Sequence, residues 1–235
     1  MWAWALLPIS LTVLGTLGIF AVCAVAVSNG TVNITATLPY ISTCGNFNPQ
    51  SCFFSQLANI LLWIVAIRFY QIRDCGLVTR GKTVLNVISL ILGIMCALGT
   101  SFTGNFQVHP LLHVLHLTGA GLAFFGGMLY FWLQVFLHKD TCCVAMVRFI
   151  LCLSGSIFIV IMFILYFNGY HSIGAACEWM AVLIFFILFG LFAVDFQHIK
   201  DFKVVVQFSL KVRNADIMLL LLCTVYSLDR RQRSF

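Results

Sequence analysis

Residues 175–196 read AACEWMAVLIFFILFGLFAVDF, a run of 22 residues that is almost entirely hydrocarbon. A helix needs about 20 consecutive apolar residues to cross a bilayer, so this run predicts a transmembrane helix. Two carboxylates interrupt it, Glu178 near one end and Asp195 near the other. A charge within a membrane span is costly and often functional. Glu178, which stands next to Trp179, is therefore the first residue whose role has to be explained.

The composition of the whole chain indicates a membrane protein. Of its 235 residues, 62% are hydrophobic and 9% are charged, with a mean hydropathy of +1.05, whereas a soluble domain has roughly 25% charged residues. Six continuous apolar runs approach the length of a span, at residues 5–27, 54–69, 84–104, 111–137, 146–168 and 175–196. A membrane β-barrel would instead show alternating strands of about ten residues. We therefore predict an all-α, multi-pass membrane protein with six transmembrane helices, in which residues 1–200 form one membrane domain.

Lysine and arginine set the orientation of the spans. If the N-terminus is inside, all 13 of these residues lie in or beside three cytoplasmic segments, 70–83, 138–145 and 197–235, as the positive-inside rule expects. Both termini are then cytoplasmic, and the net charge of +6 reflects topology rather than nucleic-acid binding. The first run also has a signal-peptide-like pattern at Ala24 and Ala26. Its length and the lack of a preceding basic residue favour a retained span.

The longest exterior segment covers residues 28–53. It contains two glycosylation sequons, at Asn29 and Asn33. Cys44 and Cys52 in the same loop flank the turn-forming residues GNFNP, and a cysteine pair in an oxidising exterior favours a disulfide. We predict glycosylation of the asparagines and a Cys44–Cys52 disulfide.

Two alternatives to that disulfide stay open. Both cysteines can carry free thiols, or Cys177 at the outer end of the last span can be the partner. Spacing alone does not decide between these pairings, because several cysteines allow several connectivities.

The stretch HPLLHVLH is the one group of residues in the sequence that suggests a catalytic or metal-binding site. His109, His113 and His116 recur on one helix face, and His113 and His116 with Glu178 from another span would suffice for an intramembrane metal-dependent lipid hydrolase. The structural alternative is that the histidines hydrogen-bond a neighbouring span, and that Glu178 either meets them or stands unpaired at the interface. We favour the structural alternative and predict no catalytic residue, no metal and no cofactor.

Small residues recur at helical spacing in two spans, at Gly119, Ala123 and Gly127 in the fourth and at Gly93 and Ala97 in the third. Such faces allow helices to approach closely, either within the chain or between copies in an oligomer. The middle of each predicted span lacks Asp, Glu, Lys and Arg, which argues against ion-coupled transport.

The segment 201–235 is predicted to be a basic, partly apolar cytoplasmic tail. Residues 202–212 alternate between apolar and polar side chains, which is typical of a strand that lies on the bilayer or adds to a partner's sheet. Residues 217–226 are apolar but too short to span a membrane.

Five motifs, in one order along the chain, resemble a known family. LPYISTCGNFNPQSCFFSQLANI (38–60), GNFQ (104–107), HLTGAGLAF (116–124), AACEW (175–179) and VDF (194–196) are similar to motifs of the DRAM family, the damage-regulated autophagy modulators, and of its transmembrane protein 150 branch. The matching residues, none with an assigned chemistry, are Pro39, Tyr40, Ile41, Ser42, Cys44, Cys52, Asn105, Phe106, Gln107, His116, Glu178 and Trp179. The tail after Phe196 departs from the family pattern.

The resemblance implies a non-enzymatic regulator of macroautophagy and cell survival, located in plasma, endosomal, lysosomal and autophagosomal membranes. It also implies the lipid bilayer and further proteins as partners, such as the phosphoinositide kinase complex for which relatives act as plasma-membrane adaptors. Other relatives contribute to mechanically gated currents, so a channel subunit joins the lipid hydrolase as an alternative. No nucleic acid is expected as a partner.

Overall fold

A computed structural model of the chain describes residues 3–46, 50–74, 80–106, 112–137, 142–197 and 199. Every regular element in these residues is a helix. The elements are α1 (Leu6–Ser28), α2 (Ile41–Cys44), α3 (Gln50–Asp74), α4 (Arg80–Asn105), α5 (His113–Gly121), the π-helical turn η1 (Leu122–Gly126), α6 (Gly127–Leu137), α7 (Cys142–Phe167), α8 (His171–Gly190) and α9 (Phe192–Phe196). The strand predicted at 202–212 and the rest of the tail lie outside the described residues.

Five helical segments of the described chain are long and apolar enough to cross a membrane, namely Leu6–Ser28, Gly81–Asn105, His113–Leu137, Cys143–Phe167 and His171–Phe196. A shorter apolar stretch, Gln56–Ile72, lies in α3. These segments confirm the predicted all-α multi-pass membrane fold. The helix α3 is longer than the predicted run 54–69 because hydropathy marks only the part suited to lipid, whereas the helical hydrogen bonds continue into polar residues at both ends.

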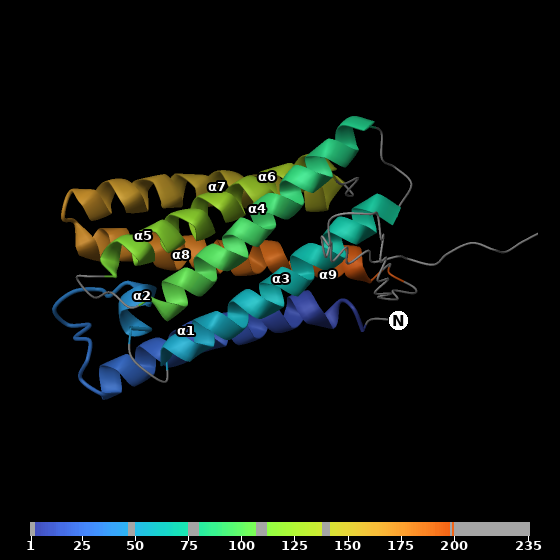
Figure 1. Cartoon of the computed structure of the whole chain (residues 1–235). Coiled ribbons are helices and arrows are strands. Elements are labelled where there is room, and N and C mark those ends of the chain that lie inside the picture. Colours follow the sequence, from blue (N-terminus) through green and yellow to red (C-terminus); the bar gives the residue numbers. More distant parts are fainter. Residues whose placement is uncertain are drawn as a thin grey trace, which may run out of the picture.

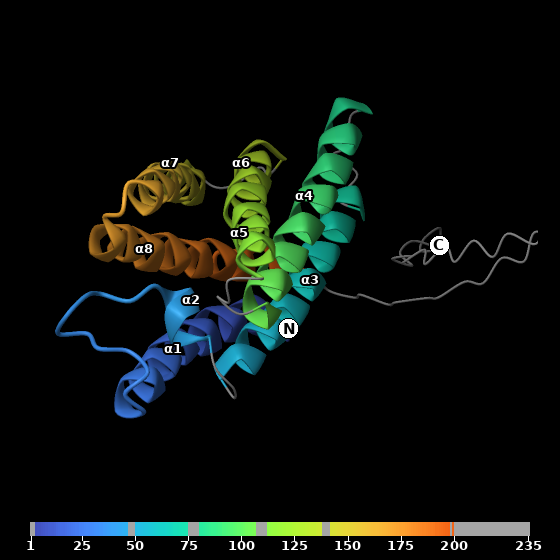
Figure 2. The same ribbon diagram turned by 60° about the vertical axis from the view of Figure 1, so that its left-hand side comes forward.

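The spans are arranged as a ring in chain order. Each span packs against the next one along the chain, and α8 returns to pack against α1. Figures 1 and 2 show this arrangement, with α8 lying between α7 and α1. Figure 1 also places α2, the start of α5 and the α7–α8 turn at one end, and the N-terminus, the start of α4 and α9 at the other. Following the distribution of Lys and Arg, we name these the exterior end and the cytoplasmic end.

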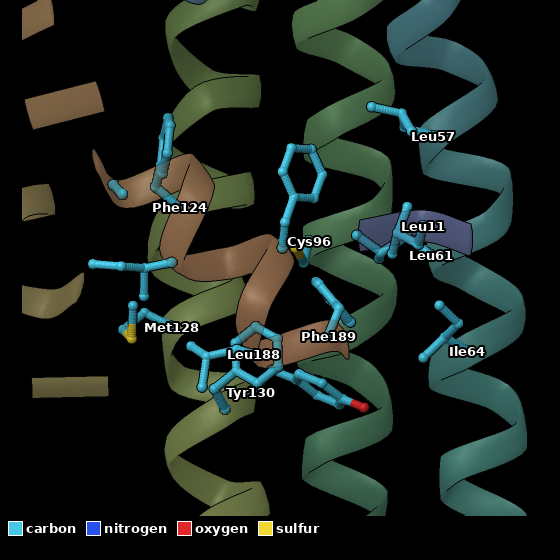
Figure 3. Packing of buried hydrophobic residues seen from close by; sticks show 14 of the residues in the cluster. Leu11, Leu57, Leu61, Ile64, Cys96, Phe124, Met128, Tyr130, Leu188 and Phe189 are labelled. Atoms are coloured by element: carbon cyan, nitrogen blue, oxygen red, sulfur yellow. The ribbon is translucent and has the colours of Figure 1, made fainter. Parts of the chain in front are cut away.

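Aromatic side chains fill much of the interior of the ring. Phe131 and Phe189 meet edge to face with ring centroids 4.6 Å apart, and Tyr130 and Phe192 extend the cluster. Figure 3 shows part of this core, to which Leu11 of α1, Leu61 of α3 and Phe189 of α8 all belong. Lipid tails are as apolar as these side chains, so dispersion contacts and close fit, rather than water exclusion, hold the spans together.

Glycines bring α4 into backbone contact with α5 and η1. A Cβ atom at Gly99 would lie 2.5 Å from the backbone nitrogen of Ala123 and 2.6 Å from the carbonyl oxygen of Gly119. The small-residue face predicted on the fourth span is therefore used for packing within the chain. The face of Gly93 is used in the same way, because a Cβ atom there would lie 2.5 Å from the side chain of Val65.

Gly99→Ala is expected to lower the free energy of unfolding by about 1–3 kcal/mol, the usual cost of overpacking a filled site. Backbone atoms cannot move aside as a flexible side chain would, so α4 must shift away from η1. Thermal unfolding of the purified protein in detergent measures the effect. Gly121→Ala is the matched control, because a Cβ atom at that position meets nothing within 4 Å. Equal melting temperatures for the two variants would contradict the close contact.

Candidate functional site

The family-like motifs, although far apart in the sequence, meet at the exterior end of the ring. Glu178 Oε2 accepts a hydrogen bond from the backbone N–H of Ile41 at 2.6 Å. The indole Nε1 of Trp179 donates to the carbonyl oxygen of Pro39 at 3.0 Å. Two adjacent residues of α8 thus hold the PYIS segment by its backbone.

The local chain conformation explains why a carboxylate is needed there. The residue before α2 is Tyr40, with an extended backbone and no side chain that caps the helix. The first N–H groups of a helix lack partners within the helix, and they carry a partial positive charge that favours an anion. Glu178 supplies this cap from a different span. Its side chain is buried, with 7% of its surface exposed.

The two histidines of the fourth span have partners other than Glu178. His116 Nδ1 lies 2.9 Å from the carbonyl oxygen of Phe106, which joins the GNFQ and HLTGAGLAF motifs. His113 Nε2 lies 3.0 Å from the hydroxyl of Tyr166 on α7. The prediction that the histidines hydrogen-bond neighbouring segments is therefore supported. The two predictions for Glu178, a contact with a histidine or no partner at the interface, are both wrong. The carboxylate is neither paired with a histidine nor left alone at the interface, because the backbone N–H of Ile41 binds it.

The geometry gives no support to the lipid hydrolase. Across the described ranges, no three His, Cys, Asp or Glu side chains lie close enough to hold a metal ion together. The third histidine of the motif, His109, lies outside those ranges, as does Gln107 of the GNFQ motif. The Asn105 amide of that motif is exposed and donates to the carbonyl oxygen of Ser101 at 2.8 Å.

Two adjoining cavities share Glu178 as a wall. We name the larger, of about 120 Å³, the apolar cavity, because it is lined by hydrocarbon side chains of α1, α3 and α8 such as Leu11, Leu61 and Phe189. The smaller, of about 80 Å³, is the polar cavity, and Tyr40, His113, His116 and Tyr166 are among its lining residues. The residues that line both are Ser42, Thr103, Phe124 and Glu178. Motif residues therefore line both cavities.

The predicted modification sites of the exterior loop have different surroundings. Asn29 and Asn33 are both exposed, as glycan attachment requires, and their glycosylation stays a prediction. Cys44 is a free, buried thiol that packs beside Cys23 of α1. Burial and the hydrogen bond with Cys23 raise the pKa of Cys44 to about 12.

The predicted Cys44–Cys52 disulfide is not formed in this structure, since Cys44 is a free thiol. The alternative partner Cys177 is free as well. The side chain of Cys52 lies outside the described part of α3. The disulfide therefore stays a prediction, and Cys23 joins the cysteines that lie near Cys44.

A buried ionic cluster at the cytoplasmic end was not predicted. Arg148 Nη2 of α7 lies 2.6 Å from Asp195 Oδ2 of α9, and Arg68 Nη1 of α3 lies 3.5 Å from Asp195 Oδ1. All three side chains have at most 3% of their surface exposed. The two guanidinium groups also stand over the ring of Phe192, at 5.2 and 5.5 Å from its centroid. In the sequence, these residues indicate only where the spans end and which end is cytoplasmic.

Gln134 extends this cluster to α4. Its side-chain oxygen accepts from Arg68 Nε at 3.0 Å, and its nitrogen donates to the Ser89 hydroxyl at 2.6 Å. Opposite charges at the cytoplasmic ends of three spans are the signal in the sequence that indicates such pairing. Asp195 is also the acidic residue of the VDF motif, so each end of the ring has one motif carboxylate that joins separate segments.

A comparison with known protein families shows which family the chain belongs to. Residues 3–199 match the Frag1/DRAM/Sfk1/Cwh43P N-terminal domain family. The chain belongs to this family. Both motif clusters described above therefore lie within the DRAM-family domain, and the resemblance seen in the sequence motifs is confirmed.

Individual DRAM-family relatives cover nearly the whole chain. Modulator of macroautophagy TMEM150B of Danio rerio is 48% identical over 92% of this chain and 96% of its own length. The Homo sapiens protein of the same name is 41% identical over 88% and 92%. Transmembrane protein 150A of Xenopus laevis is 32% identical over 85% and 86%. These names agree with the resemblance of the sequence motifs to the transmembrane protein 150 branch. No solved structure matches the chain.

Proposed function

We propose that this DRAM-family membrane protein promotes macroautophagy and acts without catalysing a reaction. One observation carries the proposal: seven relatives named modulators of macroautophagy are 41–48% identical to the chain over 85–92% of its length. The same alignments cover 87–96% of those relatives, so the similarity concerns whole proteins rather than one shared segment.

The bonding of the motif residues supports a non-enzymatic role. Glu178, Trp179 and His116 each hydrogen-bond to a backbone group of another segment. A general base or metal ligand must be directed at a reacting group, whereas these side chains fasten one part of the chain to another. They maintain the shape of the exterior end, and this shape is what a partner or a ligand meets.

The proposal extends to location and partners. The protein acts in plasma, endosomal, lysosomal and autophagosomal membranes, where it serves as an adaptor for cytoplasmic proteins such as a phosphoinositide kinase complex. The basic cytoplasmic tail 201–235 is expected to lie against anionic lipid headgroups, to which Lys and Arg close to the membrane are attracted. The channel subunit stays an alternative without a specific observation in its favour.

The test is autophagic flux in cells that lack the protein. Autophagosome number and turnover are measured with and without lysosomal blockade, after re-expression of the wild type, of Gly121→Ala as a benign control, or of an empty vector. We expect loss of the protein to lower flux, and both the wild type and Gly121→Ala to restore it. Unchanged flux in the deficient cells, under fed and starved conditions, would refute the proposed function.

A further inference from the structure

The apolar cavity lies inside the ring of spans and is bounded by α1, α3, α4, η1 and α8. Its volume of about 120 Å³ is similar to that of engineered apolar cavities of about 150 Å³, which stay free of water and bind benzene. A cavity at membrane depth has hydrocarbon available next to it, and filling it restores dispersion contacts to its lining. A space of this size holds a flexible segment of one hydrocarbon chain, and it is too small for a whole lipid chain or a rigid multi-ring body.

The exterior end of this cavity is polar. Glu178, Ser42 and Thr103 line it and the adjoining polar cavity alike. Tyr40 also lines the polar cavity, and its hydroxyl is buried against Gly174 and has no hydrogen-bond partner within the described part of the chain. A buried hydroxyl without a hydrogen-bond partner is unfavourable, so such a group calls for an explanation. A ligand that accepts a hydrogen bond from the Tyr40 hydroxyl explains why this group is buried.

The site offers a ligand both a hydrogen-bond donor, the Tyr40 hydroxyl, and a hydrogen-bond acceptor, the Glu178 carboxylate. The Tyr40 hydroxyl stays protonated and able to donate, because burial and the nearby Glu178 carboxylate raise its pKa to about 12. A carboxylate accepts hydrogen bonds only, whereas a hydroxyl both donates and accepts. A ligand hydroxyl can therefore accept from Tyr40 and donate to Glu178 at the same time.

The charges at the exterior end argue against an anionic headgroup on the ligand. All 13 Lys and Arg residues lie in or beside the segments that the positive-inside rule assigns to the cytoplasm, so a phosphate or carboxylate headgroup would find no cation at the exterior end. It would instead face the Glu178 carboxylate, and a buried charge without a partner is strongly unfavourable.

The π-helical turn lies on the same cavity. Ala123 and Phe124 of η1 are lining residues, and π-helical turns occur frequently at functional sites. η1 also takes part in the close backbone contact with Gly99 of α4. A ligand in the cavity therefore lies next to the close packing of α4 against α5 and η1.

We propose that the two cavities together bind an uncharged, hydroxyl-bearing single-chain lipid, such as a monoacylglycerol. A segment of its hydrocarbon chain occupies the apolar cavity, and its hydroxyl lies between Tyr40 and Glu178. The site takes its ligand from the exterior leaflet, where the polar cavity is located. This inference concerns binding by the purified protein, so its test is independent of the autophagy assay.

The test is photo-crosslinking of the full-length protein in phosphatidylcholine nanodiscs. Four clickable, photoactivatable probes share one chain length and carry monoacylglycerol, fatty-acid, sphingoid-amine or lysophosphatidylcholine headgroups. We expect the monoacylglycerol probe to label best, with crosslinks that map to α4, η1 and α8. Preference for a charged probe, equal labelling by all four, or crosslinks only on the outer surface of the ring would overturn the proposal. Competition by a sterol as strong as that by unlabelled monoacylglycerol would overturn the single-chain assignment.

Two variants separate binding from folding. Tyr40→Phe removes only the unpartnered hydroxyl, so we expect an unchanged melting temperature and labelling that falls by about three- to tenfold. Val182→Phe places a ring in the apolar cavity that Val182 lines, and is expected to abolish labelling without loss of stability. Tyr170→Phe is the matched control, because Tyr170 is 61% exposed at the same end of the ring and lines neither cavity. Undiminished labelling in Tyr40→Phe, or a marked loss of its stability, would contradict the assigned role of the hydroxyl.

Discussion

Asp195→Asn is expected to destabilise the protein by about 3–5 kcal/mol, the usual consequence of removing one partner from a buried ion pair. The substitution preserves shape but removes the negative charge that lies 2.6 Å from Arg148 and 3.5 Å from Arg68. Both guanidinium groups remain buried, and a buried charge that loses its partner is costly. Because α3, α7 and α9 meet at this cluster, the loss affects the packing of three spans. Thermal unfolding in detergent, together with the fraction of protein that leaves the endoplasmic reticulum, measures the effect.

Two further variants show whether charge is the cause. Asp195→Glu retains the carboxylate and should be far less destabilised than Asp195→Asn. Combining Asp195→Asn with Arg148→Gln removes one charge of each sign, so the double variant should be less destabilised than the sum of the two single variants. Additive effects, or a stability of Asp195→Asn equal to that of the wild type, would show that the cluster contributes little.

Glu178→Ala is expected to lower the free energy of unfolding by about 1.5–3 kcal/mol, the range for hydrogen bonds to a charged group. The backbone N–H of Ile41 would lose its acceptor, and the PYIS segment would detach from α8. Glu178→Gln keeps an amide oxygen and the side-chain shape, so we expect roughly half of this loss, because charge-assisted hydrogen bonds are about twice as strong as neutral ones. Stability in detergent and delivery to the plasma membrane are the measurements. A catalytic Glu178 would show the opposite pattern, with normal stability and delivery in Glu178→Gln.

The matched control for Glu178 is its near neighbour Met180. Met180 is 45% exposed on the outer surface of α8, so Met180→Leu changes the lipid-facing side of the same helical turn without touching the exterior segment. It should keep the stability and delivery of the wild type. A defect in Met180→Leu as large as that in Glu178→Ala would mean that any change in this turn is harmful.

The sequence predicted the spans well because their signal is local. Continuous apolar runs of the right length occur only where a helix crosses lipid, and the 13 Lys and Arg residues orient all of them by one rule. The close packing at Gly119 and Ala123 was also predictable, since small residues at helical spacing have few other uses in a membrane. The predicted boundaries are least accurate at α3, whose ends are polar.

The partners of the motif residues were not predictable in the same way. The sequence places Glu178 near the start of its span. Its role as an acceptor is directed at a backbone N–H group, which every non-proline residue has and no sequence pattern marks. The cluster of Arg68, Arg148 and Asp195 depends on which spans are neighbours at the same depth, and this follows from the closed ring rather than from any one segment. The π-helical turn at η1 likewise has no distinguishing composition.

The convergence of the motifs gives the family resemblance a physical meaning. PYIS, GNF, His116 and EW lie far apart in the sequence, yet they bond to one another at one end of the ring, whereas VDF belongs to the opposite end. Each motif thus supplies one side of a contact whose other side lies in another segment. Substitution of Trp179 should therefore break its contact, whereas substitution of Pro39 leaves the accepting backbone carbonyl in place.

The central claim is that Glu178 fastens the exterior segment to the last span, and amide hydrogen exchange tests it directly. Exchange is followed in the peptide that covers residues 38–46, in nanodiscs, for the wild type, Glu178→Ala and Met180→Leu. The account predicts slow exchange at Ile41 in the wild type and in Met180→Leu, and a large acceleration confined to this peptide in Glu178→Ala. Fast exchange at this amide in the wild type, or protection that persists in Glu178→Ala, would contradict the claim.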